Sequence, residues 1–245
     1  MKTLGIIGGL GPMATVYFME RIISMTQAGS DCEHIPMFVY NNPNVPDRTR
    51  YILGTSEESP YPQLLSTGKI LKAHCDCIVL PCATAHIFHE RLQKELEMPV
   101  FNMIQETSDY LKKEGITCAG LLATDGTIAG GLFRQSLKKN GIKMLIPKEQ
   151  EQKKVMHLIY DGMKADGEID IADFQRISDS LRKQGAQVII LGCTELSILN
   201  GRYELGAGYV DILEVTAAAI IKYCGGRLKP QYETLITCNP DRNGD

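Results

Sequence analysis

Two segments of this 245-residue chain share an arrangement that strongly limits how it can fold. One reads Ile-Val-Leu-Pro-Cys-Ala-Thr over residues 78–84, and the other reads Val-Ile-Ile-Leu-Gly-Cys-Thr over residues 188–194. Each is an aliphatic run, typical of a buried parallel strand, that ends at a small-residue turn with a cysteine and then a threonine. Such a turn places the cysteine side chain at the carboxyl end of an α/β sheet, where the amides of the next helix favour a thiolate. Cys82 and Cys193 therefore suggest two-base chemistry.

The spacing of the two cysteines, 193 − 82 = 111 residues, indicates an internal duplication because other features repeat at nearly the same offset. The repeated pairs are residues 4–9 with 119–124, 36–40 with 143–146, and 102–107 with 211–216. This predicts two pseudo-symmetric α/β domains with mostly parallel sheets. We place the first domain at residues 1–100 plus about 208–228 and the second at 101–207. The polar tail at 229–245 is expected to be poorly ordered.

Strand and helix patterns alternate along nearly the whole chain, as expected for parallel sheets covered on both faces. Predicted strands lie near residues 4–8, 36–41, 77–81, 99–103, 118–123, 143–146, 187–191 and 209–213. Helical periodicity is clear at 12–28, 61–73, 128–140, 151–163 and 171–183. The stretch 41–59 is the longest expected loop of the first half, and long loops at strand ends commonly carry ligand contacts.

Composition excludes several classes of function. With 44% hydrophobic residues the chain can bury a sizeable core, and a formal charge of −3 provides no basic surface for nucleic acid. No apolar run approaches the roughly 18 residues of a membrane span, and no signal peptide is recognisable. The eight cysteines contain no Cys-x-x-Cys pair, and His86 and His89 have no partner at zinc-ligand spacing. We expect a cytoplasmic protein without metal, disulfide framework, nucleic-acid partner or membrane partner.

One motif competes with the cysteines. Residues 9–14 fit the G-x-G-x-x-A dinucleotide fingerprint, but the second predicted strand ends in Asn41 and Asn42 rather than in the acidic residue that holds a ribose. We therefore expect no cofactor. Gly9 and its neighbours can instead allow the backbone to approach a small anionic substrate at the first helix N-terminus.

Two matched thiols also limit the reaction. A cysteine hydrolase uses one thiol with a histidine base, which leaves the second thiol unexplained. Inversion at a carbon acid uses both, because one thiolate removes the α-proton from one face while the opposing thiol protonates the other.

Four motifs, at residues 5–15, 41–49, 81–86 and 191–195, resemble the aspartate/glutamate racemase family and most closely its cofactor-independent aspartate racemases. The likeness extends from about residue 3 to residue 225. It implies an active site between two α/β domains, Cys82 and Cys193 as the two acid/base thiols, and a homodimer.

The resemblance also implies a substrate site. It matches Arg48 and Lys164 to residues that hold the side-chain carboxylate of aspartate, with Arg48 able to bind bidentately. By position, the threonines that follow the strands are candidates for the α-carboxylate, and Gly9 joins them: Thr84, Thr124, Thr127 and Thr194. The chain departs from the family at Ala83, where an asparagine is usual.

Several alternatives remain open at this point. Aspartate is the leading substrate, with glutamate or a broader set of amino acids next. Another carbon-acid isomerase, of the maleate isomerase or hydantoin racemase type, could use the same scaffold. Retention of both thiols disfavours a decarboxylase, which needs one proton donor. A non-catalytic binder of acidic metabolites is the third class, and Ala83 is its main argument.

Overall fold

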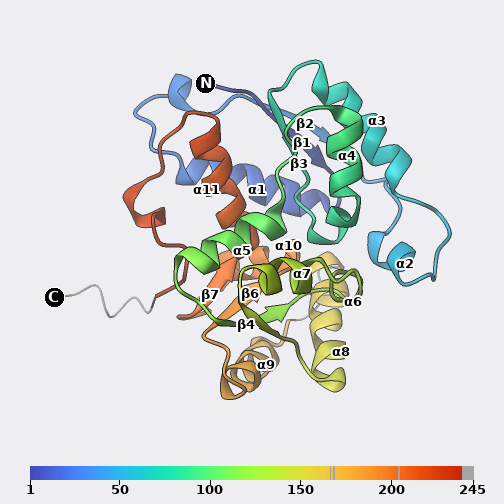
Figure 1. Cartoon of the computed structure of the whole chain (residues 1–245), viewed down its shortest axis with the longest axis vertical. Helices are drawn as coiled ribbons and strands as arrows, with labels where there is room; N and C mark the ends of the chain where they lie inside the picture. The colour runs from blue at the N-terminus through green and yellow to red at the C-terminus, as the bar shows by residue number, and fades with distance from the viewer. Residues whose placement is uncertain (166, 168, 204, 239–245) are drawn as a thin grey trace.

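The computed structural model describes residues 1–165, 167, 169–203 and 205–238, and contains two parallel sheets (Figure 1). The three-stranded sheet has the order β2-β1-β3, and the four-stranded sheet has the order β5-β4-β6-β7. The strands are β1 (Leu4–Gly8), β2 (Met37–Asn41), β3 (Cys77–Val79), β4 (Cys118–Leu122), β5 (Lys143–Leu145), β6 (Val188–Leu191) and β7 (Tyr209–Asp211). The predicted α/β class with mostly parallel sheets is confirmed.

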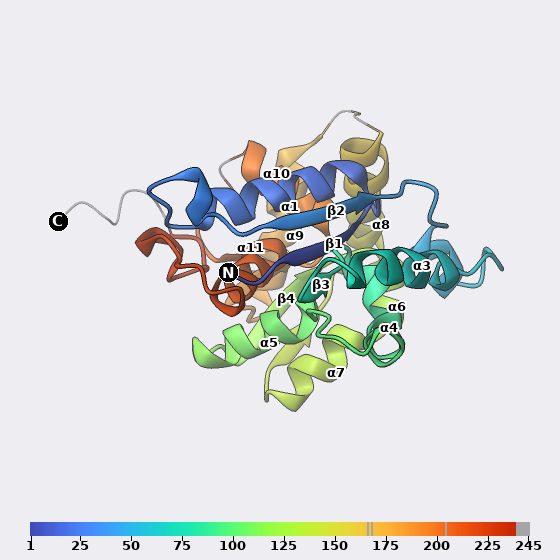
Figure 2. The same cartoon turned by 90° about the horizontal axis from the view of Figure 1, so that it is seen from above.

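Helices follow almost every strand and cover the sheets, as Figure 2 shows for α1 over β1 and β2. The α-helices are α1 (Pro12–Met25), α2 (Arg48–Ile52), α3 (Tyr61–Lys72), α4 (His89–Leu96), α5 (Met103–Lys113), α6 (Asp125–Ala129), α7 (Leu132–Lys139), α8 (Glu149–His157), α9 (Ile171–Lys183), α10 (Thr194–Arg202) and α11 (Ile212–Tyr223). The described residues also form the 3-10 helices η1 (Asp31–Glu33), η2 (Ala83–Phe88) and η4 (Pro230–Tyr232), and the π-helix η3 (Leu158–Lys164). Within the described residues, no helix is both long and apolar enough to cross a membrane.

The central strands are almost completely buried. All five residues of β1, all four of β6 and four of the five of β4 are buried, which explains why these strands contain only apolar residues and glycine. The register aligns Leu4 with both Met37 and Cys77, so the three strands of the first sheet run together toward the same edge. In the second sheet, Leu122 pairs with Leu191. Cys82 follows β3 and Cys193 follows β6, so each cysteine turn lies at the carboxyl edge of its sheet.

The predicted strand at 99–103 is wrong. Within that span only Val100 pairs, through a single parallel bridge to Ile78. Helix α5 begins immediately afterwards, because the Asn102 side chain caps it by accepting hydrogen bonds from the amides of Ile104 and Gln105. The cap shortens the extended segment to one bridged residue.

Residues 208–228, expected in the first domain, contact elements of both predicted domains. Strand β7 pairs with β6 and completes the four-stranded sheet, and the helix that follows it, α11, packs against α1 and α5. The side chain of Asp211, at the end of β7, caps α11. The division into domains at these boundaries stays a prediction.

Of the tail expected to be poorly ordered, residues 229–238 include the short helix η4 and contacts with the rest of the molecule, while 239–245 lie outside the described residues. Leu235 is buried and its amide donates a hydrogen bond of 2.7 Å to the Tyr110 hydroxyl. Ile236 forms an antiparallel bridge with Val210 of β7. Two apolar residues thus anchor a segment whose composition is otherwise polar.

Candidate active site

Cys82 and Cys193 occupy equivalent positions in the two units. Each has extended backbone and immediately precedes a helix, η2 for Cys82 and α10 for Cys193. Both side chains are buried, with 7% and 6% of their surface exposed, and both line the same cavity. Two strand ends thus bring both thiols to one cavity, and their role as acid and base stays a prediction.

The cavity between the thiols is almost closed. Its volume is about 10 Å³, which is room for about one water molecule. Its lining comprises Leu10, Asp47, Arg48, Thr49, Cys82, Ala83, Thr84, Thr124, Tyr160, Lys164, Cys193, Thr194 and Glu195. The site therefore has to open before any amino acid can enter it.

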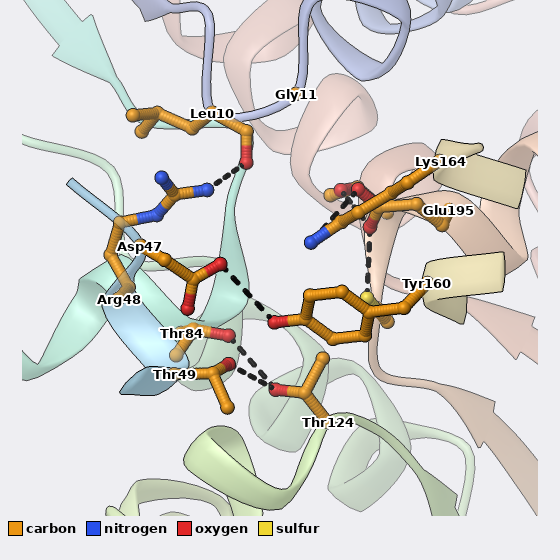
Figure 3. Close-up of polar contacts among 12 residues, drawn as sticks. Leu10, Gly11, Asp47, Arg48, Thr49, Thr84, Thr124, Tyr160, Lys164 and Glu195 are labelled. Carbon is orange, nitrogen blue, oxygen red and sulfur yellow. Dashed lines mark hydrogen bonds and ion pairs between the residues drawn. The ribbon is translucent and has the colours of Figure 1, made fainter. Parts of the chain in front are cut away.

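A buried carboxylate lies against the second thiol. The Sγ of Cys193 donates a hydrogen bond of 2.9 Å to Oε2 of Glu195, and the Thr194 hydroxyl donates to the same oxygen over 3.1 Å. The other carboxylate oxygen, Oε1, lies 3.8 Å from Nζ of Lys164 (Figure 3). Burial raises the pKa of Cys193 well above its ordinary value, and the negative charge of Glu195 raises it further.

Arg48 is a buried cation whose hydrogen-bond partners, within the described residues, are all carbonyl oxygens. Its guanidinium donates to Leu10, Val45 and Pro46, and its Nε is buried without a partner. Burial lowers the pKa of Arg48, but the nearby Cys82 and Asp47 raise it, and the net shift is upward. A buried guanidinium with no carboxylate partner is costly on its own, and a bound anion would compensate it.

Lys164 and Tyr160 reach the cavity from η3, a π-helical segment, and π-helical turns occur frequently at functional sites. The Lys164 ammonium lies 3.9 Å above the centre of the Tyr160 ring. The Tyr160 hydroxyl donates a hydrogen bond of 3.3 Å to Asp47 from the other side of the cleft (Figure 3). Burial lowers the pKa of Lys164, whereas Glu195 and Cys193 raise it, with a net upward shift.

Four threonine hydroxyls form a buried cluster at one wall. Thr84 lies 3.1 Å from Thr124 and 2.8 Å from Thr127, and Thr49 lies 3.4 Å from Thr124. Thr124 also caps α6 by accepting a hydrogen bond from the Thr127 amide. In the closed cleft these hydroxyls hydrogen-bond to one another, and Thr124 also caps a helix. A ligand that enters the cleft could exchange the bonds between hydroxyls for bonds to itself, because each hydroxyl can both donate and accept.

Behind Cys82, His86 fixes the turn. Its Nδ1 lies 2.9 Å from the Cys82 carbonyl and therefore donates to it, while its Nε2 accepts from the Met103 amide over 3.1 Å. Burial lowers the pKa of His86 to about 4. His89 stacks on the His86 ring. Among the described residues, no group of three or more His, Cys, Asp or Glu side chains could hold a metal ion.

Two of the predicted site residues do not line the cavity. Gly9 has a φ of +90°, and a Cβ there would lie 2.3 Å from the Asn42 backbone, so glycine is required for the two loops to approach each other. Its amide donates to the Thr15 hydroxyl rather than facing the thiols. Thr127 lies behind the cavity wall, where its hydroxyl hydrogen-bonds with those of Thr84 and Thr124.

Sequence reasoning missed Glu195, Tyr160, Asp47 and Thr49 as members of the site. Glu195 follows Cys193 by two residues, so its presence within the cysteine motif was the available signal. The contacts of the other three depend on how the two units approach each other, which no local pattern reports.

The fold has close counterparts among solved structures. The Picrophilus torridus aspartate racemase matches with a TM-score of 0.80 and 32% sequence identity, covering 95% of this chain and 98% of that chain. At 16% identity the glutamate racemase of Francisella tularensis subsp. tularensis SCHU S4 in complex with D-glutamate shares the fold, with a TM-score of 0.65 and coverage of 91% and 80%. The architecture is that of an α/β racemase.

Sequence comparison identifies the family. The broad specificity amino-acid racemase RacX of Bacillus subtilis (strain 168) is 28% identical over 200 residues, which cover 79% of this chain and 86% of that protein. The profile of the Asp/Glu/Hydantoin racemase family matches residues 7–221. The chain therefore belongs to the Asp/Glu/hydantoin racemase family, and the resemblance seen in its motifs is confirmed.

Proposed function

We propose that this protein interconverts the L and D forms of an acidic amino acid, with aspartate as the first substrate, by proton transfer between two cysteines. The observation that carries the proposal is that Cys82 and Cys193, from the ends of strands in different sheets, line one cavity. No other pair of thiols in the described residues shares that cavity.

The chemistry follows from opposed thiols. A thiolate on one side takes the α-proton, the electron pair of the C–H bond remains on the substrate as a carbanion, and the thiol on the other side delivers its proton to the opposite face. The first cysteine ends as a thiol and the second as a thiolate, so atoms and charge balance. The α-proton is weakly acidic, and donors preorganised near the α-carboxylate would stabilise the developing charge. Thr84, Thr124 and Thr194 line the cavity, and we expect their hydroxyls to serve as such donors.

Two cations that line the cavity support a dicarboxylic substrate. Arg48 is buried and has an unpartnered Nε, whereas Lys164 is partly exposed, lies over the Tyr160 ring and forms a 3.8 Å ion pair with Glu195. The similarity to the Picrophilus torridus aspartate racemase over nearly the full length of both chains supports aspartate. The similarity to RacX keeps a broader set of amino acids as the second candidate, and Ala83 favours it because the position usually held by an amide offers only a methyl group.

Proton NMR in D₂O tests the proposal directly. The purified protein is incubated with L-aspartate without added cofactor, and the α-proton signal is followed alongside a chiral assay. We expect the α-proton signal to disappear while D-aspartate accumulates, and Cys82→Ala and Cys193→Ala to abolish both effects. Exchange seen with glutamate or neutral amino acids but not with aspartate would favour the broad-specificity candidate. Ligand binding without exchange of any amino acid would overturn the racemase assignment.

The cytoplasmic location and the homodimer expected from the sequence remain part of this proposal. Light scattering coupled to size-exclusion chromatography tests the assembly. A mass near twice 27.1 kDa at micromolar concentration is the expected result. A monomer with full activity would show that the activity does not require a dimer.

A further inference from the structure

The two thiols have unlike electrostatic surroundings. Cys193 lies 2.9 Å from the carboxylate of Glu195, whereas Cys82 shares its side of the cavity with the guanidinium of Arg48. An anion beside a thiol opposes its ionisation, and a cation promotes it. The two cysteines therefore lie at matching strand ends but have neighbours of opposite charge.

The contacts of Glu195 are those of an ionised carboxylate. Oε2 accepts two hydrogen bonds, from Cys193 and Thr194, and Oε1 faces the Lys164 ammonium. The N-terminus of α1 also lies beside it, because a Cβ at Gly11 would be 3.3 Å from Oε1. A helix N-terminus and an ammonium both favour a negative charge at that position. The carboxylate can then only accept, so the proton of this contact belongs to the sulfur of Cys193.

We infer that Glu195 is a positioning residue that keeps Cys193 protonated in the resting enzyme and thereby assigns Cys82 as the resting base. The inference rests on the proposed racemase function. The charged and titratable groups that line the cavity with Cys193 are Glu195 from its own helix, Lys164 and Tyr160 from η3, and Asp47, Arg48 and Cys82 across the cavity. The raised pKa of Cys193 agrees with the assignment.

The assignment has a consequence for each turnover. After Cys82 removes a proton and Cys193 donates one, the free enzyme holds a Cys193 thiolate 2.9 Å from a carboxylate, and this repulsion favours reprotonation of Cys193. Since a racemisation has an equilibrium constant of one, kcat/KM is equal in both directions at every pH. The asymmetry therefore cannot be read from the two rates and has to be measured on the thiols themselves.

Site-resolved alkylation measures it. The intact protein is treated with iodoacetamide between pH 6 and 10, and modification of each cysteine is quantified by peptide mass spectrometry. We expect Cys82 to react at lower pH than Cys193. Glu195→Gln should raise the rate at Cys193 at least about tenfold at pH 7, which corresponds to a fall of one unit in its pKa, and leave Cys82 unchanged. Lys164→Met should act in the opposite direction and slow Cys193.

Matched variants separate the specific contact from general charge. Asp47→Asn removes a negative charge from the same cavity, but Asp47 contacts Tyr160 rather than a thiol, so the Cys193 rate should stay within about twofold. Glu195→Asp keeps the charge on a shorter chain and should preserve most of the protection. The Cys82 profile within each protein reports whether the fold is intact.

A second readout covers the case in which the closed cavity blocks the reagent. The basic limb of kcat/KM against pH follows the acid thiol, and Glu195→Gln should move it to lower pH. The inference is overturned if Cys193 reacts before Cys82 in the unaltered protein, or if Glu195→Gln moves neither measurement. Failure of the proposed function looks different: no amino acid is racemised while the alkylation profiles still respond to Glu195→Gln.

Discussion

Tyr160 donates a 3.3 Å hydrogen bond to Asp47, joining η3 of one unit to the N-cap of α2 in the other across the mouth of the thiol cavity. The two residues are 113 positions apart in the chain. Because the cavity holds about 10 Å³, this contact belongs to a closed arrangement that a substrate has to displace or join.

Tyr160→Phe tests the energetic weight of this contact. The ring beneath Lys164 is retained and only the hydroxyl is lost, so we expect a coupling of about 1 kcal/mol between Tyr160 and Asp47. A double-mutant cycle with Asp47→Asn, measured through KM for aspartate, gives that coupling. Strictly additive effects of the two changes would show that the hydrogen bond is absent in the working enzyme.

Loss of either cavity thiol should remove racemisation. We expect Cys82→Ala and Cys193→Ala each to lower kcat by at least about 10³-fold, within the range attributed to a positioned acid or base. Cys32→Ala is the matched control, since Cys32 is exposed and lies outside the cavity. Chiral chromatography of aspartate measures the effect, and near-normal turnover in either cavity mutant would rule out the two-thiol assignment.

Arg48→Ala should change specificity more than rate. Without the guanidinium, a side-chain carboxylate loses its bidentate partner, so we expect KM for aspartate to rise at least about tenfold and KM for neutral amino acids to change less. Arg50→Ala, on the same short helix but exposed, provides the control. An equal rise for both kinds of substrate would place Arg48 in the framework of the loop rather than in recognition.

Ala83→Asn restores the amide usual in the family. Ala83 is 4% exposed and lines a cavity with space for about one water, so we expect the added carboxamide to lower kcat/KM and to cost about 1–3 kcal/mol of stability. Ala83→Ser, which adds one atom, should have a smaller effect. A rise in activity with aspartate would show instead that the open cleft accommodates the amide.

Asp211 makes stability depend on pH. Its Oδ1 accepts from Ser197 over 2.6 Å and from the Leu213 amide over 2.8 Å, and burial raises its pKa to about 7. The folded protein therefore holds this proton more tightly than the unfolded chain, so the stabilisation is complete below about pH 4 and is lost as the pH rises to about 7.

Thermal melting against pH checks this sign. We expect the unfolding free energy to fall with a slope on the order of 1 kcal/mol per pH unit between pH 5 and 7, and Asp211→Asn to flatten that slope. Asp31→Asn, at an exposed carboxylate, should leave it unchanged. An unaltered slope in the Asp211 variant would assign the pH dependence to other groups.

The sequence predicts most strands because buried parallel strands consist mainly of consecutive aliphatic residues, such as Ile189 and Ile190. It predicts the two thiols for the same reason, since strand ends are visible locally. It fails at Val100, where a helix cap competes with extension, and it does not reveal the contacts of Leu235 and Ile236, two apolar residues in a largely polar tail. Glu195 and Asp47 acquire their roles from contacts made only after folding, so their side chains alone do not reveal them.

The segment that continues past η4 has a consequence for the behaviour of the whole molecule. The antiparallel bridge between Ile236 and Val210, with the hydrogen bond from the Thr237 amide to the Tyr209 carbonyl, occupies the outer side of β7. Strands with a free side are templates for pairing with another chain. Removal of the chain from residue 234 onward would bare that side, and the defect would emerge as self-association and loss of solubility rather than as altered chemistry.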